Sequence, residues 1–148
     1  MSDDKKENSN KLDVLQQKAT KARVSDAPTY SFMSKNEVSI TEGTKIYMAI
    51  QALAAHKVGS APVVNNQDKL VGIISEHDLL IQTATRDVKD SITYVKEVSV
   101  VTPDTPLKDV LVLLYKHKVR RIPVVMKDKS VVGIVTRMDV LLKLIGKS

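Results

Sequence analysis

A chain of 148 residues, of which 43% are hydrophobic, can bury one compact core without disulfide or metal support. It contains no cysteine, which excludes disulfides, thiolate zinc sites and thiol nucleophiles. The 23 basic and 17 acidic residues give a net charge of +6, so an anionic partner is possible. No stretch approaches about 18 uncharged apolar residues and none has the pattern of a signal peptide, so we expect a cytoplasmic protein that does not enter a membrane.

Residues 1–29 are predicted to form a flexible polar tail. They contain six basic and five acidic residues and too few apolar side chains to drive collapse. Apolar residues recur at helical spacing in part of this segment, so a short frayed helix is expected around residues 11–24. We expect residues 1 to about 25 to be dispensable for folding.

Residues 30–83 are predicted to fold in the order β-α-β-β-α. The helix carries apolar residues on one face and has Thr44 as its expected N-cap. The turn between the last two strands is rich in Asn and Asp, which suit tight turns. The expected strands and long helix are Glu37–Thr41, Thr44–Lys57, Ser60–Val64 and Lys69–Ser75.

A polar linker, residues 84–91, leads to a second segment of the same kind, residues 92–148. Its first strand is expected near Val98–Thr102 and its long helix over Thr105–Lys118. The apolar surface of this helix is wider than one stripe, because Val112, Leu113 and Tyr115 extend it. A second copy of the protein is the expected cover, which predicts a homodimer with a helical interface.

The two segments are an internal repeat. Ile40 to Gln82 aligns without a gap on Val101 to Lys143, at a constant separation of 61 residues. The repeat keeps Pro, Gly and Asp in register, as in Pro62/Pro123, Gly72/Gly133 and Asp78/Asp139. A repeat of this length is a supersecondary unit whose apolar face needs a neighbour. The predicted fold class is α/β (α+β), with two β-α-β-β-α repeats packed in pseudo-two-fold symmetry.

Each repeat contains a Gly-led strand that runs into a helix through Ser/Thr-x-x-Asp: Ser75 with Asp78, and Thr136 with Asp139. One interpretation is a capping box, in which the hydroxyl and the carboxylate bind backbone N–H groups and no ligand is needed. The other is a nucleotide-binding site, with the helix N-terminus facing phosphate and the carboxylate accepting from ribose hydroxyls. Both remain open from the residues alone.

The two repeats resemble a pair of cystathionine β-synthase (CBS) domains, together called a Bateman module, and we expect no attached enzyme or channel domain. The resemblance covers about Tyr30 to Ile145. It rests on Ala61-Pro62-Val63-Val64 and Ile122-Pro123-Val124-Val125, on the two Ser/Thr-x-x-Asp phrases, and on Thr-x-x-Thr at residues 41–44 and 102–105. It implies binding of an adenosine-containing ligand (AMP, ADP, ATP or S-adenosylmethionine) in clefts between the repeats, flat dimers, and regulation of another protein.

The resemblance also implies which residues bind. Asp78 and Asp139 match ribose-binding carboxylates, Ser75 and Thr136 match their hydroxyl partners, and Thr41 and Thr102 match residues that line the base and ribose. In some members basic residues just before the apolar-Pro motif contact phosphate. Arg120 and Arg121 hold those positions in the second repeat, whereas Gly59 and Ser60 hold them in the first, so the two sites are expected to differ.

No catalytic residue, metal site or catalytic cofactor is predicted, because no nucleophile elbow, phosphate loop or paired acid and base is present. His56 and His117 are expected at helix C-termini in structural roles. Two alternatives stay open: a nucleic-acid-binding protein that uses the basic second repeat, and an assembly module without a ligand. The low aromatic content, 3%, argues against a base-stacking surface.

Overall fold

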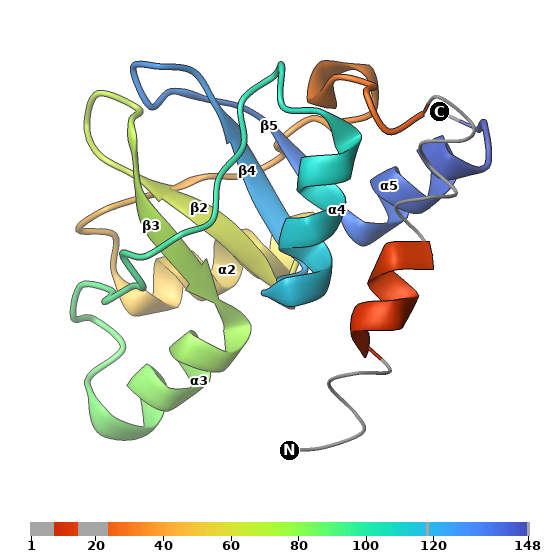
Figure 1. Cartoon of the computed structure of the whole chain (residues 1–148). Helices are drawn as coiled ribbons and strands as arrows, with labels where there is room; N and C mark the ends of the chain where they lie inside the picture. Colours follow the sequence, from red (N-terminus) through yellow and green to blue (C-terminus); the bar gives the residue numbers. More distant parts are fainter. Residues whose placement is uncertain (1–7, 15–23, 118, 148) are drawn as a thin grey trace. The chain divides into compact units, whose positions relative to one another are not determined.

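The structure is a computed structural model that describes residues 8–14, 24–117 and 119–147 (Figure 1). The chain divides into two compact units. The repeat-1 unit consists of Lys35–Val100 and Val125–Gly133, and the repeat-2 unit consists of Met1–Ser34, Val101–Val124 and Ile134–Ser148. Each unit combines segments that are distant in the sequence.

The first repeat has the predicted order β-α-β-β-α. Its elements are β1 (Ile40–Thr41), α2 (Ile46–His56), β2 (Ser60–Val64), β3 (Leu70–Ser75) and α3 (Glu76–Thr85). β1 pairs in parallel with β2, and β2 pairs antiparallel with β3. Helices α2 and α3 contact each other. In the turn after β2 the Asn65 carboxamide oxygen accepts from the N–H groups of Gln67 and Lys69, as an Asn-rich turn does.

The second repeat contains α4 (Leu107–Lys116), β4 (Arg121–Val125), β5 (Val131–Thr136) and α5 (Arg137–Leu144). β4 and β5 pair, and α4 contacts α5. The predicted strand near Val98–Thr102 is reduced to one parallel bridge between Val101 and Val124. That bridge has the register of Ile40 and Val63 in the first repeat, shifted by the repeat length. The predicted fold class, mixed α/β with two β-α-β-β-α-like repeats, is therefore confirmed.

A further backbone segment pairs alongside the last strand of each repeat. Ser34 forms an antiparallel bridge with Ile134 of β5, and Val95 forms the equivalent bridge with Ile73 of β3. The N–H and C=O groups of each pair exchange two hydrogen bonds of 2.8–3.0 Å. Gly72 lies beside the second bridge, and a Cβ atom there would collide with the Tyr94 ring and the Val95 carbonyl. Glycine at this position therefore permits the close approach of Tyr94 and Val95.

Each unit has its own hydrophobic core. In the repeat-1 unit the predicted α2 residues Ile46, Ala49 and Leu53 are buried, whereas Ile50 is 38% exposed. In the repeat-2 unit all four residues of the predicted α4 stripe are buried: Leu107, Val110, Leu111 and Leu114. The remaining apolar residues of both cores come chiefly from the strands.

In the residues that the structure describes, the N-terminal segment contains a helix and buried side chains, and its flexibility stays a prediction. Residues 8–14 are helical, and Leu12 is buried in the core of the repeat-2 unit. Thr29 is fully buried, and its N–H and its hydroxyl both donate hydrogen bonds to the Thr105 carbonyl. The predicted helix at 11–24 lies mostly outside the described residues. A few apolar side chains can hold a mostly polar segment against the protein when they are buried in a core.

The start of α2 also differs from the prediction. The N-cap is Lys45, and no side chain caps the helix there. The first N–H groups of α2 instead donate to backbone carbonyls. The Ile46 N–H donates to the Asp90 carbonyl, and the Tyr47 N–H donates to the Val88 carbonyl. The loop after α3 therefore satisfies donors that a hydroxyl at Thr44 was expected to satisfy.

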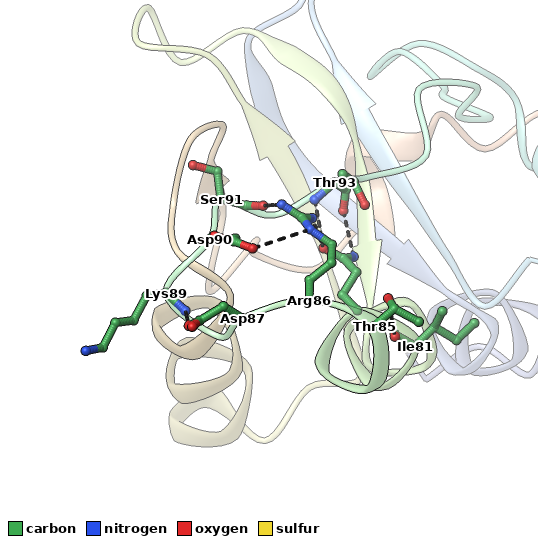
Figure 2. A network of polar contacts seen from close by, with 9 residues as sticks. Ile81, Thr85, Arg86, Asp87, Lys89, Asp90, Ser91 and Thr93 are labelled. Atoms are coloured by element: carbon green, nitrogen blue, oxygen red, sulfur yellow. Dashed lines mark hydrogen bonds and ion pairs between the residues drawn. The ribbon is translucent and has the colours of Figure 1, made fainter.

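That loop is held by a polar network (Figure 2). The Arg86 guanidinium donates to the Ser91 carbonyl at 2.6 Å and lies 4.0 Å from the Asp90 carboxylate. The buried Gln82 side chain accepts from the Thr93 N–H and donates to the Thr93 carbonyl. The predicted linker, residues 84–91, thus begins inside α3 and continues as a structured loop.

Candidate functional site

In the repeat-1 unit, Ser75 is the N-cap of α3. Its hydroxyl accepts from the Asp78 N–H at 3.2 Å and donates to the Asp78 Oδ2 at 2.8 Å. The Ser75 hydroxyl therefore caps the helix, as the capping interpretation predicts. Both side chains stay partly exposed, so the site remains open to solvent.

In the repeat-2 unit, Thr136 and Asp139 form a complete capping box at the start of α5. The Thr136 N–H donates to Asp139 Oδ2 at 2.8 Å, and the Asp139 N–H donates to Thr136 Oγ1 at 3.2 Å. The Ser34 hydroxyl donates to Asp139 Oδ1 at 2.6 Å. Among the described residues, each carboxylate oxygen thus accepts one such bond, which leaves a second lone pair for a further donor.

Ser34 is a residue that the sequence analysis missed. It reaches Asp139 because the Ser34 backbone pairs with Ile134, two residues before Thr136. The equivalent position in the first repeat is Val95, which offers no hydroxyl to Asp78. The internal repeat could have placed residue 34 beside β5 only if the pairing of residue 95 with β3 had already been known.

The two predicted threonines lie where their strands or bridges end. Thr41 is the exposed last residue of β1, and its carbonyl accepts from the Thr44 N–H at 3.1 Å. Thr102 follows the Val101 bridge and is also exposed. Its N–H donates to Thr105 Oγ1 at 3.0 Å, and the two hydroxyl oxygens are 3.1 Å apart. Both residues are therefore exposed at an ordered turn, and the Thr102 hydroxyl is paired with the Thr105 hydroxyl.

The two predicted arginines differ in burial. Arg120 is exposed, whereas Arg121 is the partly buried first residue of β4. The Arg121 Nε atom is buried and has no hydrogen-bond partner within the described residues. A buried donor without a partner is costly, because it has lost its water and gained no acceptor. An acceptor supplied from outside the chain would remove that cost.

In the first repeat, the position equivalent to Arg120 lies near an acidic side chain instead of carrying a basic one. Gly59 occupies the position of Arg120, and Glu76 the position of Arg137. The Glu76 carboxylate lies close to Gly59, so that a Cβ atom at residue 59 would be 3.2 Å from Glu76 Oε1. The Gly59 carbonyl accepts from the Glu76 N–H at 2.8 Å. An anion would meet a carboxylate here and guanidinium groups in the second repeat.

The candidate residues fall into two groups by unit. The repeat-1 unit contains Thr41, Ser75 and Asp78, and the repeat-2 unit contains Thr102, Arg120, Arg121, Thr136 and Asp139. His56 lies in the last turn of α2 with its Nδ1 atom 2.9 Å from the Ala52 carbonyl, and His117 follows α4 as its C-cap. These histidines occupy the helix ends expected for structural roles.

The strongest pKa shifts lie outside these groups. The Lys69 ammonium hydrogen bond holds the pKa of Asp128 well below its usual range, assisted by bonds from Ser130. The Tyr94 hydroxyl donates to Glu42 Oε2 at 2.9 Å, and this bond raises the pKa of Tyr94. In the described part of the chain no three His, Asp or Glu side chains are placed to hold a metal ion, and no helix there is long and apolar enough to cross a membrane.

Comparison with known proteins agrees with the repeats. Residues 24–82 and 88–146 each match the family of the CBS domain. An inosine-5'-monophosphate dehydrogenase of Methanocaldococcus jannaschii is 33% identical over 108 residues, which are 72% of this chain and 21% of the dehydrogenase. The chain therefore spans about a fifth of that relative.

Two solved structures are similar over most of the chain. CBSX2 in complex with AMP has a TM-score of 0.67 at 29% identity and covers 77% of this chain and 92% of its own. The CBS domain pair of protein MJ0100, in complex with 5'-methylthioadenosine and S-adenosyl-L-methionine, has a TM-score of 0.70 at 28% identity and covers 82% and 98%. The chain belongs to the CBS domain family and contains a tandem pair of these domains, a Bateman module.

Proposed function

We propose that this protein senses an adenosine-containing ligand, either an adenine nucleotide (AMP, ADP or ATP) or S-adenosylmethionine, and signals its presence to another protein. The observation that carries the proposal is the capping box of Thr136 and Asp139 at the start of α5, together with Arg121 of β4, whose buried Nε has no acceptor among the described residues of the same unit. Relatives of this fold bind AMP, 5'-methylthioadenosine and S-adenosylmethionine. The proposal assigns no catalytic step to the chain.

The carboxylates are proposed to accept from ribose hydroxyls. The capping bonds at Asp139 leave one lone pair on each oxygen, so capping and ribose binding are compatible. Capping also fixes the rotamer of the carboxylate before a ligand arrives, which lowers the entropic cost of binding. Asp78 is proposed to serve the same function in the first repeat, with Ser75 as its hydroxyl partner.

The arginines are proposed to make the second repeat the phosphate site. Arg121 Nε needs an acceptor, and Arg120 adds a second guanidinium next to it in the chain. A charge-assisted hydrogen bond contributes about 1.5–3 kcal/mol, which corresponds to roughly tenfold or more in affinity. The first repeat has Glu76 close to the equivalent position, which disfavours phosphate. Adenosine phosphates should therefore bind more tightly through the second repeat.

Calorimetric titration with AMP and with adenosine tests this assignment. Arg121→Ala should weaken AMP about tenfold or more and leave adenosine unchanged, because only phosphate uses the guanidinium. Asp139→Ala should weaken both ligands, and Asp78→Ala should spare the tighter AMP event. The assignment is wrong if Asp78→Ala abolishes the tight event while Arg121→Ala leaves AMP affinity unchanged.

A thermal-shift screen of AMP, ADP, ATP and S-adenosylmethionine identifies the ligand class. A ligand present at 100 times its dissociation constant adds about 2.7 kcal/mol to the free energy of unfolding. Stabilisation by S-adenosylmethionine alone would move the proposal from nucleotides to sulfonium ligands. No stabilisation by any of the four would favour the assembly module without a ligand.

The sensing unit is proposed to be a homodimer. Large aliphatic side chains remain exposed on α3 and α5, including Leu80 at 68% and Leu141 at 54%. Neighbouring residues Ile81 and Leu142 are exposed as well, and this repetition on both helices suggests a covered face. Light scattering at tens of micromolar should give the dimer mass.

A further inference from the structure

The turn that joins β4 to β5 belongs to a different unit from the outer ends of these strands. Residues Val125–Gly133 are part of the repeat-1 unit, whereas β4 begins and β5 ends in the repeat-2 unit. We call residues 126–130 the second turn and residues 65–69 the first turn, because they occupy equivalent positions of the internal repeat. One hairpin therefore continues from the repeat-2 unit into the repeat-1 unit through unbroken backbone.

The second turn is bound to the first turn by backbone and side-chain contacts. Lys69 and Ser130, which are equivalent residues of the two repeats, form an antiparallel bridge. The Leu70 N–H donates to the Lys129 carbonyl at 2.8 Å. The Lys69 ammonium lies 2.8 Å from Asp128 Oδ2, and 31% and 60% of the two side chains are exposed. The backbone bond therefore supplies most of the attachment, and the exposed ion pair adds to it modestly.

The Asp128 carboxylate also stabilises its own turn. Its Oδ1 atom accepts from the N–H and from the hydroxyl of Ser130, at 2.9 and 2.6 Å, while Oδ2 accepts from Lys69. The bond from Lys69 and those from Ser130 hold the pKa of Asp128 well below its usual range, so the carboxylate is ionised at neutral pH. Gln67 occupies the equivalent position in the first turn. One side chain of the second turn thus fixes that turn and binds the first.

The opposite ends of the same two strands carry residues of the proposed ligand site. Arg121 is the first residue of β4, and Thr136 is the last residue of β5. The Arg121 Nε atom is buried and lacks an acceptor among the described residues. Between these ends and the second turn, Val124 and Val135 are fully buried. Strands packed in a close-packed core transmit strain along their length, so a restraint at one end acts on the other.

We infer that the contact between the two turns is a latch that reports occupancy of the phosphate site to the repeat-1 unit. A phosphate that accepts from Arg121 fixes the start of β4, and the more rigid hairpin holds its turn more firmly against Lys69 and Leu70. By linkage, a ligand that binds the latched form more tightly lowers the population of the open form by the same factor. The inference rests on the proposed function for its ligand, whereas the latch itself is tested without one.

Hydrogen exchange of single backbone amides, followed by NMR, tests the latch in the ligand-free protein. Lys69→Glu should speed exchange of the Leu70 N–H about threefold or more, because it places a second carboxylate opposite Asp128 and leaves the bonds to Ser130 intact. Lys69→Arg keeps the ion pair and should exchange as the native protein does. Equal exchange of Leu70 in the native protein and in Lys69→Glu would overturn the latch.

Lys127→Glu is the matched control variant. It makes the same charge change in the second turn, at an exposed side chain that takes part in no ion pair of the described residues. Exchange of the Leu70 N–H should therefore be the same as in the native protein. Equal acceleration by Lys127→Glu and Lys69→Glu would show a general effect of charge on the turns and would overturn the assignment to the ion pair.

Exchange in saturating AMP tests the transmission. AMP should slow exchange of the Leu70 N–H about fivefold, within the usual range of coupling between sites. The Asn65 N–H, which donates to the Lys69 carbonyl at 2.9 Å within the first turn, is the control amide and should not change. Calorimetry on the same sample measures AMP binding. AMP that binds and leaves exchange of Leu70 unchanged overturns the inference.

Failure of the ligand proposal gives a different result from failure of the latch. A native protein that binds no AMP in calorimetry overturns the proposed function and the transmission together, and the effect of Lys69→Glu then describes a contact of the fold alone. AMP binding that weakens in Arg121→Ala, with exchange of Leu70 insensitive to AMP in the native protein, keeps the phosphate site and overturns the latch as its reporter.

Discussion

At the residue scale, the two Asp residues at the helix starts have different surroundings. Asp139 accepts from the Thr136 N–H and the Ser34 hydroxyl, whereas the bond to the Asp78 carboxylate comes from Ser75. Sequence predicted both Ser/Thr-x-x-Asp phrases as caps or as ligand sites, and the structure shows caps that leave acceptor capacity. Ser34 escaped prediction because a hydroxyl far away in the chain has no local signal.

We predict that Asp139→Ala lowers the free energy of unfolding by about 1–2 kcal/mol, because it removes the capping box and leaves Ser34 without its acceptor. Asp78→Ala is the matched variant and should cost less, because it removes the single bond from the Ser75 hydroxyl, whereas Asp139→Ala removes the bonds from the Thr136 N–H and the Ser34 hydroxyl. The N-cap hydroxyl keeps its bond from the backbone N–H in both variants. Urea denaturation of both variants measures the difference. Equal losses would show that the extra bonds at Asp139 contribute nothing.

Tyr94 gives a prediction for alkaline pH. The hydrogen bond to Glu42, followed by desolvation and the negative charge of Glu42, raises the pKa of Tyr94 above its ordinary value of 10.0. The folded state therefore holds the phenol proton more tightly than the unfolded state, so this contribution to stability is complete below pH 10 and is lost as the pH rises through the folded pKa.

Ultraviolet titration should follow this ionisation directly. Glu42→Gln should lower the pKa of Tyr94, because the amide carries no charge and is a weaker acceptor. Tyr94→Phe should remove the corresponding part of the alkaline loss of stability. An identical tyrosine titration in the native protein and in Glu42→Gln would contradict the assignment of the shift to this bond.

At the element scale, the predictions that agree with the structure are those that depend on residues close together in the sequence. β2 matches its predicted bounds, Ser60–Val64, because a short apolar run ends at an Asn-rich turn. The first strand of each repeat is shorter than predicted, Ile40–Thr41 in one case and a single bridge at Val101 in the other. Strand length depends on a pairing partner, and local pattern contains no information about that partner.

The N-terminal helix at residues 8–14 overlaps the start of the frayed helix expected at residues 11–24, but its packing on a core was not predicted. Leu12 is 6% exposed, and the Tyr115 hydroxyl donates to the Asn8 carbonyl at 2.6 Å. Leu12→Ala should lower the free energy of unfolding by about 2 kcal/mol or more, as removal of a buried leucine side chain does. Val14→Ala is the matched control, because Val14 is 59% exposed and should cost little.

Thermal unfolding of these two variants decides whether the N-terminal segment is part of the fold. Equal, small shifts in melting temperature for Leu12→Ala and Val14→Ala would support the prediction that the N-terminal segment is dispensable for folding. A larger shift for Leu12→Ala would show that docking of residues 8–14 stabilises the repeat-2 unit.

At the scale of the whole molecule, the net charge of +6 is unevenly distributed. Residues 92–148 contain eleven basic and five acidic residues, whereas residues 31–91 contain six and seven. This excess is consistent with phosphate recognition by Arg120 and Arg121 and also with the alternative of nucleic-acid binding. The alternatives differ in how many phosphates the protein neutralises at once.

A salt series on heparin separates them. A nucleic-acid-binding protein should elute late and lose affinity steeply with salt, because it neutralises many phosphates together. We predict early elution, with little change on Arg121→Ala, together with stabilisation by an adenosine ligand. Late elution that depends on Arg120 and Arg121, without any stabilisation by nucleotides, would favour the nucleic-acid alternative.

The bridges of Ser34 to Ile134 and of Val95 to Ile73 have a consequence for the order of folding. During synthesis Ser34 leaves the ribosome long before Ile134 exists, so the N-terminal segment must wait unpaired until the last hairpin emerges. The repeat-1 unit also gains Val125–Gly133 of that hairpin only at this stage, although its core residues all precede Val95. Closing such long loops is slow, so we expect the repeat-2 unit to complete its folding only after the last hairpin has emerged.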